Sequence, residues 1–256
     1  MIPKIIHYCW LSNDPIPQKL LDYMKSWKDI LPDYELMLWN FDRFNKDSSL
    51  WVKQAFDNKK YAFAADYIRL FALYNYGGIY LDMDVEVLKD FAPLLKLKSF
   101  FCWQNAFSSP ESPSPGLEVA AMGVEKGCPW IRLCLDRYSN RPFVSEHGFD
   151  MKPLPHVVES VLRENNISLH TVQNIDEAVE FENKGIPVFT CDFFSPKSFD
   201  TGIIEKTKNT YCIHHFSGSW CKKKSLMRAK VYQFLRRNFG ESVAKFVRKI
   251  FGKRKK

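Results

Sequence analysis

The stretch AFAADYIRLFALYNYGGIYLDMD, residues 62–84, constrains the fold more than any other part of the chain. Its first part is rich in alanine and leucine and predicts a helix. Gly77 and Gly78 predict where that helix ends, because glycine is favoured in the left-handed conformation of a helix stop. The apolar residues that follow predict a short strand, with Asp82 and Asp84 at its carboxyl end. In open α/β sheets, that end of a strand is where ligands bind.

Strand and helix patterns alternate from the beginning of the chain. Residues 4–11 have the apolar character of a buried strand, residues 17–30 have helical apolar spacing, and residues 34–40 predict a second strand. This alternation predicts an α/β fold with a mostly parallel sheet flanked by helices. Further strands are predicted at 99–105, 117–124 and 210–216, and further helices at 129–138 and 153–165.

Composition limits the number of domains and the compartment. A chain of 256 residues, 46% of them apolar, is long enough for one sizeable domain with a small appendage. Its seven cysteines are scattered and form no CxxC pair, which argues against a zinc knuckle or a disulfide framework and favours the cytosol. The first residues lack the layout of a signal peptide, and no uninterrupted apolar run approaches the roughly 20 residues that span a bilayer.

The positive charge is concentrated at the end of the chain. The net charge is +8, but residues 221–256 contain 14 Lys and Arg against Glu241, which leaves residues 1–220 with a net charge of −5. We therefore divide the chain into a domain at 1–221 and a basic tail at 222–256. The tail has two amphipathic helical patterns separated by Gly240, as expected of helices that lie on anionic membranes. The alternative is that the tail docks on the acidic body; no motif indicates a nucleic-acid partner.

The two aspartates of LDMD indicate a cation site. On an extended strand, residues i and i+2 point to the same side, so Asp82 and Asp84 should project together. Adjacent carboxylates repel each other unless a cation lies between them, and oxygen ligands favour Mg²⁺ or Mn²⁺. A D-x-D pair alone is a weak motif. Its position after the Gly-Gly stop and an apolar strand favours an enzyme that uses a nucleotide-activated substrate.

Asp66 and Arg69 lie three residues apart on the preceding helix and therefore share a face. One interpretation is an ordinary intrahelical ion pair. However, the neighbouring residues are mostly apolar, and a charged pair in a buried helix is costly unless it meets a polar ligand. Sugar hydroxyls suit this pair, because a carboxylate accepts hydrogen bonds from them and a guanidinium donates to them.

Taken together, these blocks resemble glycosyltransferase family 32, the DXD sugar transferases. The resemblance is carried by AADYIRLFALYNYGGIYLDMDV, and it extends to IPKIIHYCW, VEKGCPWI and IHHFSGSW, so that it covers roughly residues 1–220. It implies a GT-A fold and a retaining transfer of sugar from a nucleotide sugar, with Mn²⁺ or Mg²⁺ as cofactor.

The resemblance also implies roles for particular residues. His215 corresponds to a late metal ligand, with His214 as the alternative because neighbours on a strand face opposite ways. Ser217 or Ser219 stands near the family's hydroxyl donor, where this chain has Gly218. Glu118 and the pair Gln104–Asn105 are weaker candidates for lining the sugar pocket. The implied site is Asp82 and Asp84 for catalysis, Asp66 and Arg69 for the donor sugar, Trp10, Trp220 and Asp82 for the nucleotide, and Asp84 and His215 for the metal.

The implied reaction moves a hexose to a glycan acceptor, which can be lipid-linked, with a UDP-sugar favoured over GDP-mannose as donor. The expected setting is bacterial surface polysaccharide synthesis (capsule or lipopolysaccharide), in the bacterial cytoplasm at the inner face of the plasma membrane. One alternative is a haloacid-dehalogenase-like phosphatase with Asp82 as nucleophile, although the later acidic pair of that family is missing. Another is a sugar- or membrane-binding module without turnover.

Overall fold

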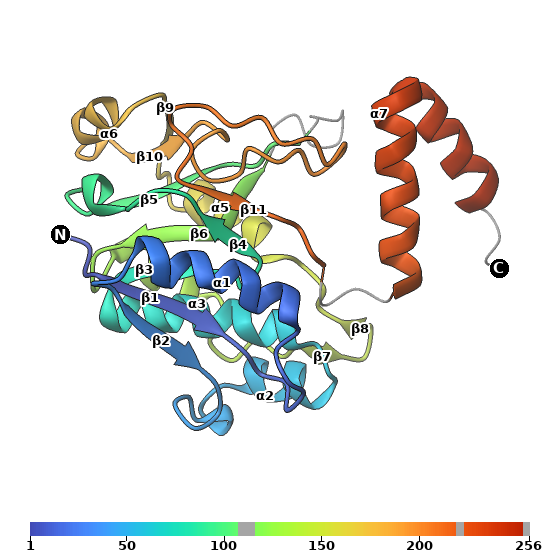
Figure 1. Ribbon diagram of the computed structural model, residues 1–256. Coiled ribbons are helices and arrows are strands. Elements are labelled where there is room, and N and C mark those ends of the chain that lie inside the picture. The colour runs from blue at the N-terminus through green and yellow to red at the C-terminus, as the bar shows by residue number, and fades with distance from the viewer. Residues whose placement is uncertain (107–115, 219–222, 253–256) are drawn as a thin grey trace.

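The computed structural model describes residues 1–106, 116–218 and 223–252 and is built around a seven-stranded sheet (Figure 1). The strand order is β2-β1-β3-β6-β5-β10-β9. Only β6 runs antiparallel to its neighbours in this sheet, so the predicted mostly parallel sheet is confirmed. The strands are β1 (Ile5–Cys9), β2 (Glu35–Trp39), β3 (Gly78–Leu81), β5 (Ser99–Trp103), β6 (Leu117–Val124), β9 (Leu169–Val172) and β10 (Ile186–Phe189).

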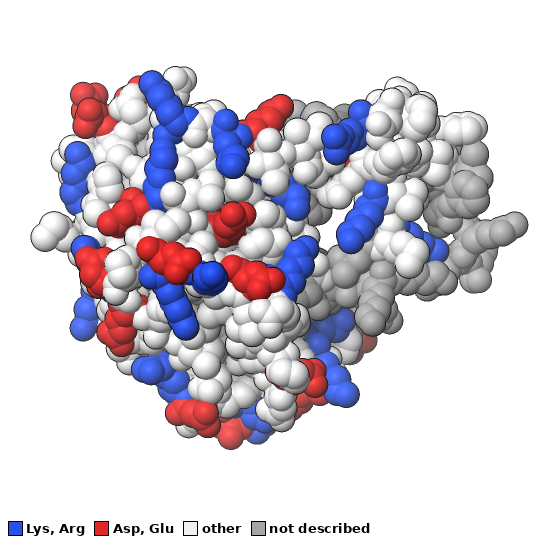
Figure 2. All heavy atoms as spheres, viewed as in Figure 1, with Lys and Arg blue, Asp and Glu red and all other residues white. Residues whose placement is uncertain are grey.

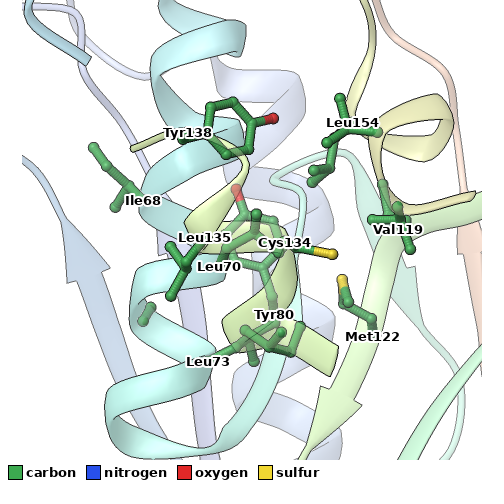
Figure 3. Packing of buried hydrophobic residues seen from close by; sticks show 14 of the residues in the cluster. Ile68, Leu70, Leu73, Tyr80, Val119, Met122, Cys134, Leu135, Tyr138 and Leu154 are labelled. Carbon is green, nitrogen blue, oxygen red and sulfur yellow. The ribbon is translucent and has the colours of Figure 1, made fainter. Parts of the chain in front are cut away.

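Helices cover both faces of this sheet, and each face has its own apolar core. Successive residues of β3 point to opposite sides, so Tyr80 packs in one core while Ile79 and Leu81 pack in the other. The core around Tyr80 is formed with α2 (Leu50–Asp57), α3 (Tyr61–Tyr76), α4 (Pro129–Asp136) and α5 (Leu154–Glu164) and is shown in Figure 3. The other core is formed with α1 (Gln18–Ile30) and α6 (Ile175–Phe181).

Smaller elements complete the described chain. The strand β4 (Val85–Val87) pairs antiparallel with β11 (Cys212–His214), and β7 (Val144–Ser145) pairs with β8 (Gly148–Phe149). Short 3₁₀ helices lie at η1 (Lys46–Ser48) and η2 (Ala92–Leu94), and α7 (Lys223–Gly252) forms the tail. The tail is broken at Gly240, where φ is 82°, as the two helical patterns predicted. Within the described residues, no helix is both long and apolar enough to traverse a bilayer.

The turn between α3 and β3 explains the pair of glycines. Gly77 and Gly78 have φ values of 67° and 101°, which side chains rarely adopt. A Cβ atom at Gly77 would lie 2.6 Å from the backbone nitrogen of Lys126, and one at Gly78 would lie 2.7 Å from the carbonyl oxygen of Ile5. The chain therefore passes from α3 into the buried strand β3 without a loop, and the aspartates come directly at the end of β3.

His7, on β1, is buried against this turn as a neutral ring. The indole N–H of Trp39 donates to His7 Nδ1 at 3.1 Å, so the proton of the ring is on Nε2, which donates to the carbonyl oxygen of Gly77 at 2.7 Å. Burial lowers the pKa of His7 to about 4. A proton added to Nδ1 would break the hydrogen bond from Trp39.

We expect His7 to make folding sensitive to mild acid. Because the pKa of His7 is lower in the folded than in the unfolded chain, its contribution is complete above about pH 6.5 and is lost as the pH falls toward 4. At about pH 5, the loss should be ~2 kcal/mol of unfolding free energy. Urea unfolding at several pH values would measure it, and His7→Gln should remove this part of the pH dependence. An unchanged pH dependence in the variant would refute the prediction.

Candidate active site

The two aspartates lie where β3 ends and the chain turns into β4. The backbone N–H of Asp82 donates to the carbonyl oxygen of Ala120 on β6 at 2.8 Å, and the carbonyl oxygen of Asp82 accepts from the N–H of Val85 at 2.9 Å. Residues 82–85 therefore form a turn, where the sequence analysis assumed an extended strand. The two carboxylates nonetheless lie close together, as expected. Met83 packs into the core, while Asp82 and Asp84 stay together outside it.

His214 joins the aspartates from β11. The antiparallel pairing of β11 with β4 places His214 opposite Val85, next to the turn. His214 Nε2 lies 3.4 Å from Asp84 Oδ1. Within the described residues, Asp82, Asp84 and His214 form a group whose possible ligand atoms all lie within 4.8 Å of one another. Two carboxylates and one imidazole can hold a divalent cation.

His215 points the other way. Its Nε2 atom lies 2.8 Å from Glu86 Oε2, and its ring stacks on Tyr23 with a centroid distance of 4.2 Å. Only its backbone reaches the site, where its N–H donates to the carbonyl oxygen of Asp84 at 3.0 Å. The geometry therefore favours His214 as the nitrogen ligand, where the sequence analysis favoured His215. The reason is that consecutive residues of a strand face opposite sides.

Glu118 holds the far side of the His214 ring. Glu118 is only 4% exposed, and its Oε2 atom lies 3.0 Å from His214 Nδ1. The same oxygen accepts from the hydroxyl of Ser195 at 3.1 Å, while Oε1 accepts from the backbone N–H of Ala120 at 2.9 Å. A carboxylate on one nitrogen of a histidine leaves the other nitrogen free to bind metal. The sequence predicts Glu118 only as a weaker candidate for lining the sugar pocket, and its contact with His214 is not predicted, although a lone acid in the apolar strand LEVAAMGV is a signal of a special role.

Asp66 and Arg69 approach the same site from α3. Arg69 is buried and donates from Nη2 to Asp82 Oδ1 at 2.9 Å and from Nη1 to the carbonyl oxygen of Val119 at 2.6 Å. The Asp66 carboxylate lies farther from Nη2, at 3.6 Å, so its acceptor capacity is largely unused by Arg69. The predicted pair therefore shares a face and belongs to the group around Asp82.

The electrostatics of the site separate its acids into two kinds. Burial raises the pKa of Asp66 to about 7 and also raises the pKa of Asp82, against the effect of Arg69. Burial alone would also raise the pKa of Asp84 and of Glu118, but His214 between them holds both below their usual values. Burial alone would lower the pKa of His214, but Glu118 and Asp84 hold it well above its ordinary value. Asp84 and Glu118 are thus firmly ionised.

The segment after β11 closes over the aspartates. The backbone N–H of Ser217 donates to Asp84 Oδ2 at 2.6 Å, and the ring of Phe216 lies against His214 with a centroid distance of 4.1 Å. The buried hydroxyl of Ser217 has no hydrogen-bond partner among the described residues, so it is a candidate donor to a ligand. Trp10 follows β1 and is half-buried, and its indole N–H donates a hydrogen bond to the carbonyl oxygen of Asp14. Trp220 lies outside the described residues.

Part of the chain matches a known family of proteins. Residues 17–101 match the family model described as "Glycosyltransferase sugar-binding region containing DXD motif". The matched range contains Asp66, Arg69, Asp82 and Asp84. The chain is 39% identical over 134 residues to inositol phosphoceramide mannosyltransferase 3 of Schizosaccharomyces pombe, a match that covers 51% of this chain and 35% of that protein.

Other similarities are weaker. Over 104 residues, the chain is 38% identical to mannosyl phosphorylinositol ceramide synthase CSH1 of Saccharomyces cerevisiae, which covers 39% of this chain and 27% of that protein. The chain thus spans about a quarter to a third of the length of these curated relatives. The UDP-bound glycosyltransferase domain from the YGT toxin gives a TM-score of 0.47 at 12% identity, over 97% of this chain and 89% of that chain.

Proposed function

We propose that this chain, whose residues 17–101 carry a glycosyltransferase sugar-binding region of the DXD type, is as a whole a metal-dependent glycosyltransferase that moves a hexose from a nucleotide sugar to a glycan acceptor. The observation that carries the proposal is the meeting of Asp82, Asp84 and His214 at the end of β3. This group is assembled from two distant parts of the chain, and Arg69 from α3 contacts it.

Asp82, Asp84 and His214 would hold the divalent cation. Carboxylate oxygens suit Mg²⁺ and Mn²⁺, and the imidazole among the donors favours Mn²⁺, because Mg²⁺ prefers an all-oxygen shell. The buried hydroxyl of Ser217 and the Glu118 carboxylate behind His214 both fit such a site. When bound, the cation would supply positive charge to the diphosphate leaving group, whose negative charge grows as the sugar–phosphate bond opens.

The remaining residues would orient the donor. Arg69 is held by the carbonyl oxygen of Val119 and by Asp82, so its guanidinium is fixed beside the aspartate pair. Asp66, with a pKa raised to about 7, can accept a hydrogen bond from a sugar hydroxyl or donate one to it. We assign Asp66 and Arg69 to the donor sugar, and Trp10 and Trp220 to the nucleotide. Transfer with retention of the anomeric configuration is part of the same proposal.

The acceptor that we propose is held by a membrane. The relatives are named as enzymes of inositol phosphoceramide, a lipid, and as mannosyltransferases, which brings GDP-mannose in as a candidate donor beside the UDP-sugars. We propose bacterial surface polysaccharide synthesis (capsule or lipopolysaccharide), with a lipid-held acceptor, as the setting. The corresponding location is the cytoplasmic side of the plasma membrane, with the enzyme peripheral to it.

A donor screen tests the proposal. The full chain is incubated with Mn²⁺ and, in turn, UDP-glucose, UDP-galactose, UDP-N-acetylglucosamine and GDP-mannose, and release of the nucleoside diphosphate is measured with and without EDTA. We expect one donor to be hydrolysed in a metal-dependent way. Phosphate release from phosphomonoesters would instead support the phosphatase. Against that alternative, Arg69 donates a hydrogen bond to Asp82 Oδ1, an oxygen of the residue that would be the phosphatase nucleophile. Nucleotide-sugar binding without turnover would support the non-catalytic module.

A further inference from the structure

The tail helix α7 contacts the body through its polar side. α7 stands at the edge of the molecule beside the loop at residues 198–204 (Figure 1). The side-chain amide of Gln233 donates to the carbonyl oxygen of Phe199 at 2.8 Å, and Arg236 forms an ion pair with Asp200. Arg236 also pairs with Glu241 at 2.7 Å, across the break at Gly240. These contacts fix which side of the helix faces the body.

The apolar side of α7 faces away from that loop. An α-helix turns about 100° per residue, so Met227, Val231 and Phe234 lie within an arc of about 60°. By the same geometry, Gln233 and Arg236 lie about 120° and 180° from Met227. The three apolar side chains are accordingly 68%, 50% and 59% exposed. A helix on the surface of a globular protein normally has the reverse arrangement, with its apolar side toward the core.

Basic side chains line both edges of this apolar stripe. Lys230 and Arg237 lie about 60° and 80° to one side of Met227, and Arg228 lies about 100° to the other. All three are exposed, and Figure 2 shows blue Lys and Arg side chains beside white ones on this helix. Beyond the break, Val243 and Phe246 are exposed as well. An apolar stripe between basic edges is the arrangement of a helix that lies in the interface of an anionic membrane.

We propose that the stripe formed by Met227, Val231 and Phe234 is a docking surface for an anionic lipid bilayer. Charge argues against a second copy of the chain as the occupant, because two such helices would bring basic edges together. The acidic body is not the occupant either, since the body holds the opposite side of the helix. The surface therefore favours the membrane over docking on the body, the two alternatives for the tail.

The same contacts would fix the active site relative to the membrane. The loop that receives α7 carries Phe199, whose ring contacts Phe216 with a centroid distance of 5.3 Å. Phe216 in turn lies against His214, the proposed metal ligand. A bilayer under α7 would thus lie at a set distance and orientation from the site, as a membrane-held acceptor requires. Only this last step rests on the proposed function; the docking surface itself does not.

Vesicle flotation of the full chain tests the docking surface. We expect the protein to float with vesicles of phosphatidylcholine that contain phosphatidylglycerol, and to stay behind with phosphatidylcholine alone. The double variant Val231→Ser/Phe234→Ser should lose at least about tenfold in binding, because it removes apolar area that the bilayer would bury. Lys230→Glu/Arg237→Glu should remove the preference for anionic vesicles. Phe149→Ser is the matched control, since Phe149 is an exposed phenylalanine on β8, and it should float like the wild type.

Three results would overturn the proposal. These are equal binding to both kinds of vesicle, unchanged flotation of Val231→Ser/Phe234→Ser, and a wild-type dimer in light scattering that the same double variant makes monomeric. Donor hydrolysis is measured in parallel, because Val231 and Phe234 lie outside the active site and their substitution should leave it unchanged. Flotation without any donor turnover would sink the proposed function and leave the docking surface standing.

Discussion

Asp84→Asn is expected to lower metal-dependent donor turnover by about a thousandfold or more, because it removes one of the two carboxylates that face the proposed cation. The substitution keeps the size of the side chain, and the amide oxygen can still accept from the N–H of Ser217, as Asp84 Oδ2 does at 2.6 Å. The turn at residues 82–85 is held by backbone hydrogen bonds and should not change. The loss should therefore come from the missing charge and not from unfolding.

Two measurements separate these causes for Asp84→Asn. Calorimetric titration with Mn²⁺ should show binding to the wild type and none to the variant under the same conditions, and the thermal midpoint should stay close to that of the wild type. Asp176→Asn is a suitable control, since it makes the same chemical change at a side chain that is 94% exposed on α6. A variant at Asp84 with near-normal turnover would remove the metal from the proposed mechanism.

The local part of the site could be predicted from the sequence. The end of α3, the Gly-Gly stop, β3 and the two aspartates are contiguous, so each is set by residues within one or two turns of the chain. The shared face of Asp66 and Arg69 follows from helix periodicity in the same way. The amphipathic character of the tail was also readable. Which side of α7 faces the body was not, because a contact from the distant residue Asp200 to Arg236 decides it.

The features that could not be predicted from the sequence depend on pairing between distant strands. Whether His214 or His215 faces the aspartates depends on the register of β11 against β4, in which His214 lies opposite Val85. That register joins residues almost 130 positions apart, and a shift by one residue would exchange the two histidines. Similarly, the all-buried β6 reads as a strand without revealing its direction, which is antiparallel to β3 and β5. The four-residue strands β9 and β10 were too short to show a clear period.

Glu118 becomes important through that same antiparallel strand. β6 lies between β3 and β5, so its second residue reaches the end of β3 where the aspartates and His214 meet. Glu118 does not belong to the group that would contact the cation. It acts on His214, as a positioning residue, because its Oε2 atom accepts a hydrogen bond from Nδ1–H and leaves Nε2 pointing toward Asp84.

Glu118→Gln is expected to reverse this arrangement without a change in side-chain size. The buried N–H of Ala120 needs an acceptor, now Glu118 Oε1 at 2.9 Å, so the amide oxygen should take that place. The amide NH₂ then faces His214 and donates to Nδ1, which leaves the ring proton on Nε2 alone. Metal binding at Nε2 would require that proton to move to Nδ1, where it would face the amide NH₂. We therefore expect Mn²⁺ affinity to fall by about 10- to 100-fold.

The protonation of His214 Nδ1 distinguishes positioning from simple damage to the fold. In nitrogen-15 NMR spectra of histidine-labelled, metal-free protein, we expect the wild-type ring of His214 to carry a proton on both nitrogens, because Glu118 and Asp84 hold its pKa well above the ordinary value. Glu118→Gln should remove the proton from Nδ1 and keep the one on Nε2, and Mn²⁺ titration should show the weaker affinity. Ser195→Ala is the matched control, because it removes the other hydrogen bond to Oε2 and keeps the carboxylate. We expect that variant to retain the proton on Nδ1 and most of the metal affinity. If Glu118→Gln and Ser195→Ala lose affinity equally, Glu118 supports only the local packing, and His214 must be oriented by another contact.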